Sequence, residues 1–440
     1  MISKIEKRSL VVACFAALLG AGSVWAQSEL PPTFEFSFSN PGARSMGFGG
    51  AFAALADDAT AAFANPAGLV QLVSPEISIE GRHWSYSTPY VSGGRIWGPP
   101  TGIGIDTTAG LRTSTSDEDL KGLSFLSFVY PKGRWSFAFY RHMVSNYEFE
   151  GTLNGLYSGP WPDTGSQRRE FAYHKTVDLQ IVSYAAAVAY EVTERLSLGL
   201  ALNYIDGDID LITGVYGIIR SGTPEDEFFA PIPVVPENRF YTTSLLIADQ
   251  DWGVNLGIHW RPTEGWRFGA FVREGPKFRT VAELQAGPTF VPPGMSGQVI
   301  ESETGNVRFP SVYGIGASYR TGQDRVTVSF EWDRVTYSSI FSSDDELHIN
   351  DGNELHLGGE YAFLTVAPVV SLRAGIWLDP DHQISYSGDN YVAEAVLTGG
   401  EDQMHYAVGL GLAFDRFQLD LAADFSDLVD TLSLSLIYSF

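Results

Sequence analysis

Clusters of acidic residues and of glycines are the parts of this sequence whose residue types and spacing could form a cation-binding or phosphate-binding site. Asp57-Asp58 and Asp344-Asp345-Glu346 could hold a cation, although adjacent acids more often belong to a solvated turn. The glycine-rich residues 47–50 follow no strand and precede no P-loop lysine, which argues against phosphate binding. The eight histidines are scattered without the spacing of metal ligands. We therefore expect no metal site and no cofactor.

The sequence also lacks the motifs of familiar enzymes. It contains neither a G-x-S-x-G nor an H-E-x-x-H pattern, and its one cysteine is Cys14. A hydrolase embedded in a membrane barrel would need a Ser/His pair at the membrane edge, and no such pair is evident. We expect a protein that is not an enzyme.

The first residues have the features of a secretory signal peptide. Lys4, Lys7 and Arg8 precede an apolar stretch over residues 10–21, and small residues end at Ala26. This pattern predicts a signal peptide over residues 1–26, cleaved after Ala26. Lipoprotein cleavage at Cys14 is disfavoured because the apolar stretch continues past it. The mature chain would be cysteine-free and exported.

Charge argues against nucleic acid as a partner. The formal net charge is −24, and removing three bases and one acid with the signal peptide gives −24 − 3 + 1 = −26. Phosphate neutralisation needs an excess of Lys and Arg, which this chain lacks.

Alternation of apolar and polar residues dominates the chain after residue 72. In the last segment Leu432, Leu434 and Leu436 alternate with Ser433 and Ser435, and the pattern recurs at residues 196–204, 252–260 and 406–414. Such alternation predicts strands with one apolar face and one face of small or polar residues. Aromatic residues near strand ends favour a membrane barrel with aromatic girdles over a soluble sandwich: Trp135, Trp252, Trp260, Trp266, Trp332 and Tyr438.

The spacing of these segments predicts about fourteen strands over residues 75–440. Short connections, as at residues 131–133 and 193–194, alternate with long ones, as at 88–120 and 207–239. An even strand count with short turns at one end and long loops at the other is typical of outer-membrane proteins. We expect an all-β, transmembrane antiparallel β-barrel in the outer membrane of a Gram-negative bacterium, in contact with its lipid and monomeric.

Residues 27–74 differ from the rest and predict a small helical hatch that plugs the lumen. Residues 51–56 are expected to form a short helix and residues 57–63 a second turn, while Asn65-Pro66 cannot continue a helix. Small residues would let the segment fold compactly within a barrel. The residues that we expect to act in gating are Asn65, Pro66, Ala67, Gly68, Asp57 and Asp58.

The long loops are unexpectedly apolar in two places. The apolar residues of the third and fourth long loops are Phe228, Phe229, Ile232, Val234, Val235, Phe290 and Val291. They could line a groove that captures an apolar ligand. The alternative, equally open from the sequence, is that they pack the loops against one another.

Residues 40–72 resemble the N-terminal hatch of the FadL family of outer-membrane transporters for hydrophobic compounds. The matching residues include Gly49, Gly50 and the Asn65-Pro66-Ala67 motif, and weaker matches such as Phe309-Pro310 extend over most of the mature chain. The resemblance implies a fourteen-stranded barrel, a hydrophobic groove in the third and fourth external loops, and lateral exit at a kink in the third strand. That strand is expected over residues 135–149, with the kink among Arg141, His142, Ser145 and Asn146.

The sequence as a whole favours a passive channel for hydrophobic small molecules such as long-chain fatty acids or aromatic hydrocarbons. Such a ligand would be captured by apolar loops and released sideways into the bilayer past the hatch. The alternative is a FadL-like barrel that anchors or receives a partner in protein secretion or assembly. Residues 27–39 are longer than the start of FadL-type chains, so no individual pocket residues are assigned there.

Overall fold

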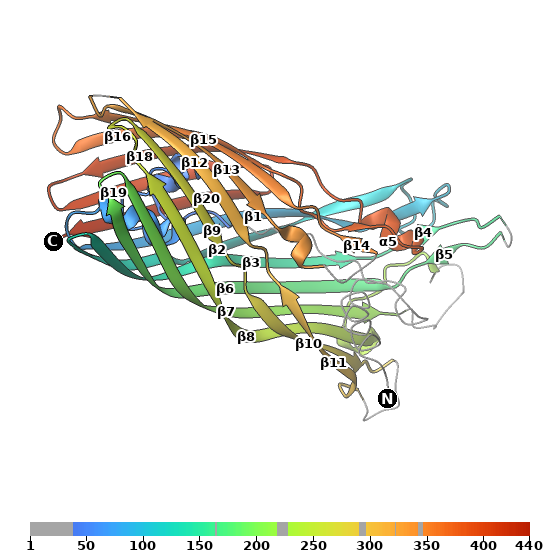
Figure 1. Cartoon of the computed structure of the whole chain (residues 1–440). Coiled ribbons are helices and arrows are strands. Elements are labelled where there is room, and N and C mark those ends of the chain that lie inside the picture. Colours follow the sequence, from blue (N-terminus) through green and yellow to red (C-terminus); the bar gives the residue numbers. More distant parts are fainter. Residues whose placement is uncertain (1–37, 163–164, 218–227, 290–295, 322, 342–345) are drawn as a thin grey trace.

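The computed structural model describes residues 38–162, 165–217, 228–289, 296–321, 323–341 and 346–440 of the 440-residue chain. These residues form a long β-barrel with helical pieces inside it (Figure 1). The predicted signal peptide over residues 1–26 and the start of the predicted hatch lie outside the described residues.

No helix in the described part of the chain is long and apolar enough to cross a membrane.

The barrel wall is one antiparallel sheet with fourteen strand positions, as the sequence predicted. Twelve positions are occupied by uninterrupted strands: β1 (Glu76–Trp97), β2 (Leu111–Lys132), β3 (Trp135–Leu153), β6 (Ala172–Thr193), β7 (Leu196–Tyr216), β8 (Arg239–Trp260), β13 (Val326–Val335), β15 (Gly352–Phe363), β16 (Val369–Asp379), β18 (Gln403–Ala413), β19 (Phe417–Phe425) and β20 (Val429–Ser439). The other two are split, one into β9 (Trp266–Arg273) and β10 (Lys277–Ala286), the other into β11 (Val299–Arg308) and β12 (Val312–Arg320). The wall closes where β1 pairs with β20, from Glu76↔Ser439 to Tyr86↔Val429.

The connections alternate in length as predicted. Short turns and the C-terminus lie at one end of the barrel, and the long loops lie at the other (Figure 1). The long loops carry the short elements β4 (Leu156–Ser158), β5 (Arg168–Arg169), η2 (Pro236–Asn238), η3 (Tyr337–Ser339), β14 (Leu347–His348), β17 (Ser385–Tyr386) and α5 (Tyr391–Val396). The predicted loop over residues 88–120 was too long, because β1 continues to Trp97 and β2 begins at Leu111.

The two faces of the wall exchange their polarity part-way along the strands. In β7, Leu198 and Leu202 are exposed on the outer face, while Ser197 and Asn203 are buried inside. Beyond Tyr204 the apolar residues of β7 instead face inward: Ile205, Ile209 and Leu211. Exposed Asp208 and Asp210 take their place outside. The prediction of a small or polar interior is therefore right only for the half nearer the short turns.

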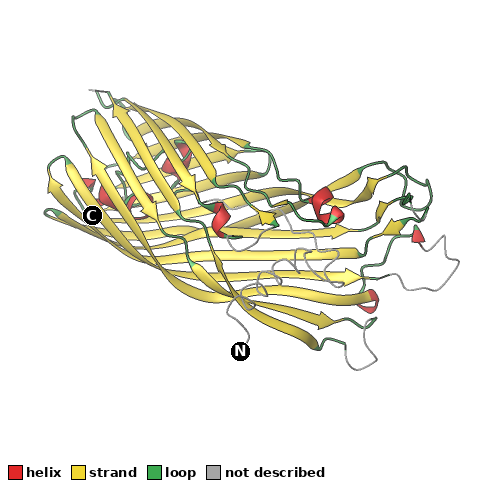
Figure 2. Cartoon of the chain, turned by 45° about the vertical axis from the view of Figure 1, so that its right-hand side comes forward, coloured by secondary structure: helices red, strands yellow, loops and turns green. Residues whose placement is uncertain are grey.

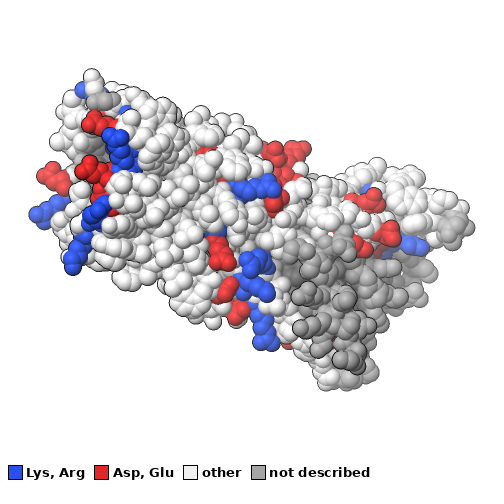
Figure 3. Space-filling view, viewed as in Figure 1, with Lys and Arg blue, Asp and Glu red and all other residues white. Residues whose placement is uncertain are grey.

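The outer surface has the apolar belt of a membrane barrel. In Figure 3 a broad uncharged zone separates charged residues at the short-turn end from charged residues further along. Exposed aromatic residues gather near the short turns, among them Tyr130, Trp135, Trp260, Trp266, Tyr319, Tyr361, Phe414, Phe417 and Tyr438. An apolar belt with an aromatic girdle at its edge is the pattern expected of a strand-built membrane protein.

The hatch fills the barrel near the short turns (Figure 2). It contains two single-turn α-helices, α2 (Ala43–Gly47) and α3 (Ala61–Ala64), and the 3-10 helix η1 (Pro66–Gln71). The helix predicted over residues 51–56 was wrong: this segment forms turns, and no helix was predicted where α2 lies. Tertiary packing overrides the helix propensity of its alanines, because their backbone lies directly against the wall.

Inward-facing glycines allow this close packing. A side chain on any of five wall glycines would collide with hatch atoms at 2.1–2.2 Å: Gly199, Gly257, Gly269, Gly358 and Gly375. Four of these collisions involve hatch backbone atoms, for example the Phe48 carbonyl oxygen at Gly358. Only glycine permits such an approach of two backbones. The hatch is therefore fitted to the wall on several sides.

Candidate functional site

The first described residues of the hatch are hydrogen-bonded to charged side chains of the wall. The Arg82 guanidinium donates to the Asn40 carbonyl oxygen at 2.6 Å, and Arg273 donates to the Asn40 side-chain oxygen at 2.6 Å. The Gly42 amide donates to the Glu80 carboxylate at 2.9 Å. Because β1 and β9 supply these groups, they fix where the hatch enters the lumen.

The Asn65-Pro66-Ala67-Gly68 segment joins the hatch to β7 and β8 of the wall. The fully buried Asn65 amide donates to the carbonyl oxygens of Ala53 at 2.9 Å and Ile258 at 3.0 Å, and its oxygen accepts from the Ala67 amide. Pro66 is the first residue of η1, and the Ala67 carbonyl accepts from the Ser197 hydroxyl at 2.8 Å. Gly68 lies so close to the Ala56 carbonyl that a side chain would not fit. These positions suit a hinge or anchor of the hatch.

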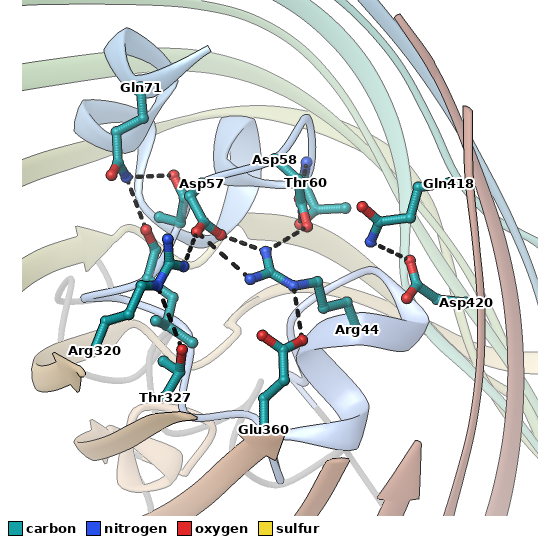
Figure 4. Close-up of polar contacts among 12 residues, drawn as sticks. Arg44, Asp57, Asp58, Thr60, Gln71, Arg320, Thr327, Glu360, Gln418 and Asp420 are labelled. Carbon is teal, nitrogen blue, oxygen red and sulfur yellow. Dashed lines mark hydrogen bonds and ion pairs between the residues drawn. The ribbon is translucent and has the colours of Figure 1, made fainter. Parts of the chain in front are cut away.

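A buried ion-pair network holds the side of the hatch that faces the short turns. Figure 4 shows Arg44 of the hatch between Asp57, Asp58 and Glu360. Arg320 of β12 contacts Asp57 at 2.9 Å. Arg373 of β16 continues the network, at 2.7 Å from Glu360 and 2.6 Å from Asp420. The interpretation of Asp57-Asp58 as a solvated turn was wrong, because the Asp58 side chain is buried, the Asp57 side chain is only 15% exposed, and both pair with Arg44.

The network controls the ionisation of the two hatch acids. Burial alone would raise the pKa of Asp57, but the guanidinium groups around it, above all that of Arg44 and then that of Arg320, together outweigh burial and lower that pKa well below its usual range. Burial dominates at Asp58 and raises its pKa. Asp58 also accepts hydrogen bonds from the Thr60 amide and hydroxyl, so it supports the turn that leads into α3. A charged Asp57 thus depends on Arg44.

A polar cavity of about 290 Å³ lies beside this network. Its lining includes Arg44, Asp57 and Asp58 of the hatch, and Arg373 and Gln418 of the wall. It also includes the turn over residues 414–416, which places it at the short-turn end. Polar lining suits water better than an apolar ligand.

The ladder between β2 and β3 stops part-way along both strands. Their pairing runs from Lys132↔Trp135 to Phe125↔His142 and does not continue, although β3 extends to Leu153 and β2 starts at Leu111. We call the space between β2 residues 111–124 and β3 residues 143–153 the β2–β3 gap. Beyond Phe125↔His142 a few side chains replace the ladder, such as the Ser116 hydroxyl, which accepts from the Glu150 amide at 2.9 Å.

The predicted kink in the third strand coincides with a β-bulge. The pairing of β3 with β6 skips Val144, since Met143↔Val182 is followed by Ser145↔Ile181. Arg141 and His142 immediately before the bulge donate to the Leu123 and Ser124 carbonyl oxygens of β2. Ser145 and Asn146 follow the bulge along the open edge. A bulge bends a strand and ends regular pairing, which explains why β3 separates from β2 here.

Aromatic side chains line the β2–β3 gap from inside. The Tyr86 hydroxyl donates to the Asn146 carbonyl oxygen at 2.8 Å, which satisfies a backbone group left without a β2 partner. Tyr86 packs edge-to-face on Tyr147 with ring centroids 5.2 Å apart. Both belong to a buried apolar cluster that also includes Leu120 and Met143 at the gap. The lumen is thus apolar where the wall is open.

A second cavity, of about 260 Å³, lies among the outer ends of the strands and the long loop before β18. Its apolar lining residues are Pro89, Tyr90, Val91, Phe149, Leu153, Tyr173, Ile384, Val396 and Leu397. Thr113, Lys175, Gln383 and Thr398 supply its polar groups. Phe149 belongs to both this cavity and the apolar cluster of the gap. The volume is slightly below the roughly 300–1,000 Å³ of typical ligand pockets. This cavity, here called the outer cavity, can accept a small apolar molecule.

The apolar residues predicted in the third long loop do not line the outer cavity. Phe228 and Phe229 pack against Tyr157, and Ile232 is 4% exposed in a cluster with Ala172. Val234 packs partly on that cluster, whereas Val235 is exposed. Phe290 and Val291 of the fourth loop lie outside the described residues. The described positions favour loop packing, the alternative that the sequence left open.

Comparison with known proteins agrees with this geometry. A family model described as outer membrane protein transport protein (OMPP1/FadL/TodX) matches residues 32–431. This chain belongs to the OMPP1/FadL/TodX family. It is therefore an outer-membrane barrel of a family that carries hydrophobic compounds, and it is not an enzyme. The resemblance to the FadL family is confirmed.

Solved structures share the fold at low sequence identity. The CymD monoaromatic hydrocarbon channel is 18% identical with a TM-score of 0.55, and the toluene transporter TbuX of Ralstonia pickettii is 17% identical with a TM-score of 0.55. The toluene transporter TodX of Pseudomonas putida is 14% identical with a TM-score of 0.56. Each comparison covers 92% of this chain and 99% of the other. No curated protein sequence matches the chain.

Proposed function

We propose that this OMPP1/FadL/TodX protein is a passive channel in which apolar small molecules leave sideways through the β2–β3 gap. The observation that carries the proposal is the end of the β2–β3 ladder at Phe125↔His142, beside the Val144 bulge. A ligand in the apolar lumen can pass between the two strands there without crossing the hatch.

The route begins in the outer cavity. Phe149 and Tyr90 join the cavity to the apolar cluster of the lumen, which reaches the gap at Tyr147 and Met143. Burial of apolar surface is worth about 25 cal/mol per Å², so each step keeps the ligand out of water. No energy source is needed, because the ligand moves between apolar environments.

The exit lies at the edge of the apolar belt. Leu123 and Phe139 beside the last β2–β3 pairs are exposed on the outer face, whereas Asp119 and Glu148 further out are polar and exposed. A ligand that passes the gap therefore meets the outer part of the bilayer. In this proposal the hatch domain spans residues 27–74, its described part from residue 38 onward closes the lumen below, and residues 75–440 form the barrel domain.

The substrate class follows from size and polarity rather than from one specific contact. Monoaromatic hydrocarbons suit the outer cavity, which has a mostly apolar lining and a volume of about 260 Å³. Two of the solved relatives are named as transporters of such a compound, toluene. Long-chain fatty acids would occupy the cavity and part of the lumen. A role as receptor for a protein partner is less favoured, since Phe229 and Ile232 are 7% and 4% exposed.

Two matched substitutions distinguish the outer cavity from the predicted loop groove. Ile384→Asn places an amide in the apolar lining of the cavity, whereas Val235→Asn changes an exposed residue of the third loop. An unpaired polar group in an apolar site costs about 1–3 kcal/mol, so capture should weaken roughly 5- to 150-fold in Ile384→Asn.

The measurement is the initial rate of uptake of toluene and of a long-chain fatty acid by cells that carry each variant in place of the chromosomal gene. We expect Ile384→Asn to slow uptake of at least one compound and Val235→Asn to leave both rates unchanged. Slower uptake in Val235→Asn alone would instead support the loop groove. Wild-type rates in a strain that lacks the gene would contradict the transport function itself.

A further inference from the structure

Four titratable side chains face the lumen from two neighbouring strands beside the hatch. Glu331 and Asp333 of β13 pair directly with His356 and Glu354 of β15. Glu331 accepts a hydrogen bond from the Ala53 amide of the hatch at 2.6 Å. Asp333, Glu354 and His356 remain as a group of three potential metal ligands, with one donor atom from each lying within 4.8 Å of the others.

The hydrogen bonding of His356 prepares it to bind a cation. Its Nδ1 lies 2.7 Å from the Gly49 carbonyl oxygen, so Nδ1 carries a proton and donates it to the hatch. In the neutral ring, Nε2 then holds a free lone pair. Histidines that bind metals usually donate their other ring N–H to a backbone carbonyl or a carboxylate, which fixes the tautomer and orientation.

Two buried atoms of the group lack hydrogen-bond partners within the described part of the chain. They are Oδ1 of Asp333 and Nε2 of His356, which has an ion-pair contact with Glu354 but no hydrogen bond of normal geometry; each residue is 6% exposed. Burying polar atoms without partners is costly, so such atoms call for a ligand that satisfies them. Nε2 lies 3.4 Å from Oε2 of Glu354, and two ligands of a tetrahedral Zn²⁺ with bonds of about 2.1 Å would also be about 3.4 Å apart.

Space for a cation lies next to these atoms. A cavity of about 60 Å³ is lined by all three residues and by Gly49 and Gly50 of the hatch. A single water needs about 10–15 Å³ of such volume, so an ion and its remaining water ligands fit. Aspartate, glutamate and neutral histidine together suit Zn²⁺ and similar transition metals.

We propose that Asp333, Glu354 and His356 bind a divalent transition-metal cation, such as Zn²⁺, at the contact between the wall and the hatch. The cation would hold His356 in the tautomer that donates to Gly49. The hatch loop at Gly49 and Gly50 is thereby fastened to β15. The scattered histidine positions in the sequence gave no sign of this site, because its ligands come from two strands that pair in space.

Direct metal binding tests the proposal. The full-length protein is purified in detergent, stripped with EDTA, incubated with Zn²⁺ alone and desalted, and the bound metal is counted by mass spectrometry. We expect one tightly bound Zn²⁺ per chain in the wild type. The affinity should fall at least about tenfold in His356→Gln and in Glu354→Gln, since second-shell changes alone cost 10- to 100-fold.

His259→Gln is the matched control. His259 of β8 also reaches a hatch carbonyl, that of Ala54 at 2.9 Å, but it belongs to no group of candidate ligands in the described residues. This variant should bind Zn²⁺ like the wild type. X-ray absorption of the wild-type Zn²⁺ protein, which needs no variant to fold, should show one histidine nitrogen and carboxylate oxygens at about 2.0–2.2 Å. No bound Zn²⁺ in the wild type, or equal affinity in wild type and His356→Gln, would overturn the proposal.

Discussion

Deleting Val144 is expected to reduce uptake of apolar compounds to the level of a strain without the gene. Val144 is the extra residue of β3, and its neighbours Met143 and Ser145 already pair with consecutive β6 residues, Val182 and Ile181. The deletion therefore leaves the pairing of β3 with β6 in register on both sides. With the bulge removed, β3 can continue alongside β2 past Phe125↔His142, and the gap closes.

Val144→Ala is the control for this deletion. It shortens the side chain but keeps the extra residue, so the bulge and uptake should both persist. The measurement is the initial uptake rate of toluene and of a long-chain fatty acid, with barrel folding checked by its resistance to dodecyl sulfate before heating. Wild-type uptake in a folded Val144 deletion would show that the ligand does not pass between β2 and β3.

Replacing Arg44 by methionine is expected to release the hatch. Arg44 contacts Asp57, Asp58 and Glu360, and its loss leaves these carboxyl groups buried with fewer partners. Breaking a buried ion pair by removing one partner costs about 3–5 kcal/mol. If most of this cost falls on the seated hatch, the fraction of barrels with a displaced hatch rises roughly 10²–10³-fold. Single-channel recording in planar bilayers would then show frequent large openings.

Arg334→Ala provides the comparison with an ion pair away from the hatch. Arg334 of β13 pairs with Asp351 at 2.8 Å, and its side chain is 37% exposed. Exposed pairs contribute about 0–1 kcal/mol, so this variant should keep the quiet baseline of the wild type. An equally quiet baseline in Arg44→Met would mean that the Arg44 network does not hold the hatch.

The strands could be predicted from the sequence because their alternation is a local signal. Leu432, Leu434 and Leu436 lie on the outer face, and Ser433 and Ser435 lie on the inner face. The alternation of short and long connections then indicates an even number of strands, with the short turns at one end of the barrel. The change of polarity at Tyr204 was missed, since Asp208 and Asp210 looked like residues of the loop predicted over 207–239. They instead belong to the outer face of a strand that continues to Tyr216.

The hatch could be located but its internal structure could not. The alanines of residues 51–56 favour a helix locally, yet the segment follows the wall, where Gly269 and Gly358 let its backbone approach closely. Helix propensity is worth less than 1 kcal/mol per residue for most residue types, so tertiary packing decides such short segments. The Arg44 network was missed because its members come from the hatch, β12, β15, β16 and β19.

The position of the β2–β3 gap could be expected from the sequence, but the interruption of the β2–β3 ladder could not. The position of the kink was implied by family resemblance, and Arg141 and Asn146 lie on either side of the bulge. No residue pattern distinguishes an interrupted ladder from a continuous one, however, because both β2 and β3 remain extended. The apolar third loop was ambiguous for a related reason, since Phe229 looks alike in a groove and in a packed loop.

Photolabelling tests lateral release most directly. Cells or reconstituted vesicles are loaded with a fatty acid that carries a diazirine in its alkyl chain, and after irradiation the labelled residues are mapped by mass spectrometry. Lateral release predicts labels in the outer cavity and along the β2–β3 gap, at residues such as Phe149, Leu120 and Met143. Labels at the polar cavity beside Arg44 and Gln418, with none at the gap, would show passage through the hatch and contradict it.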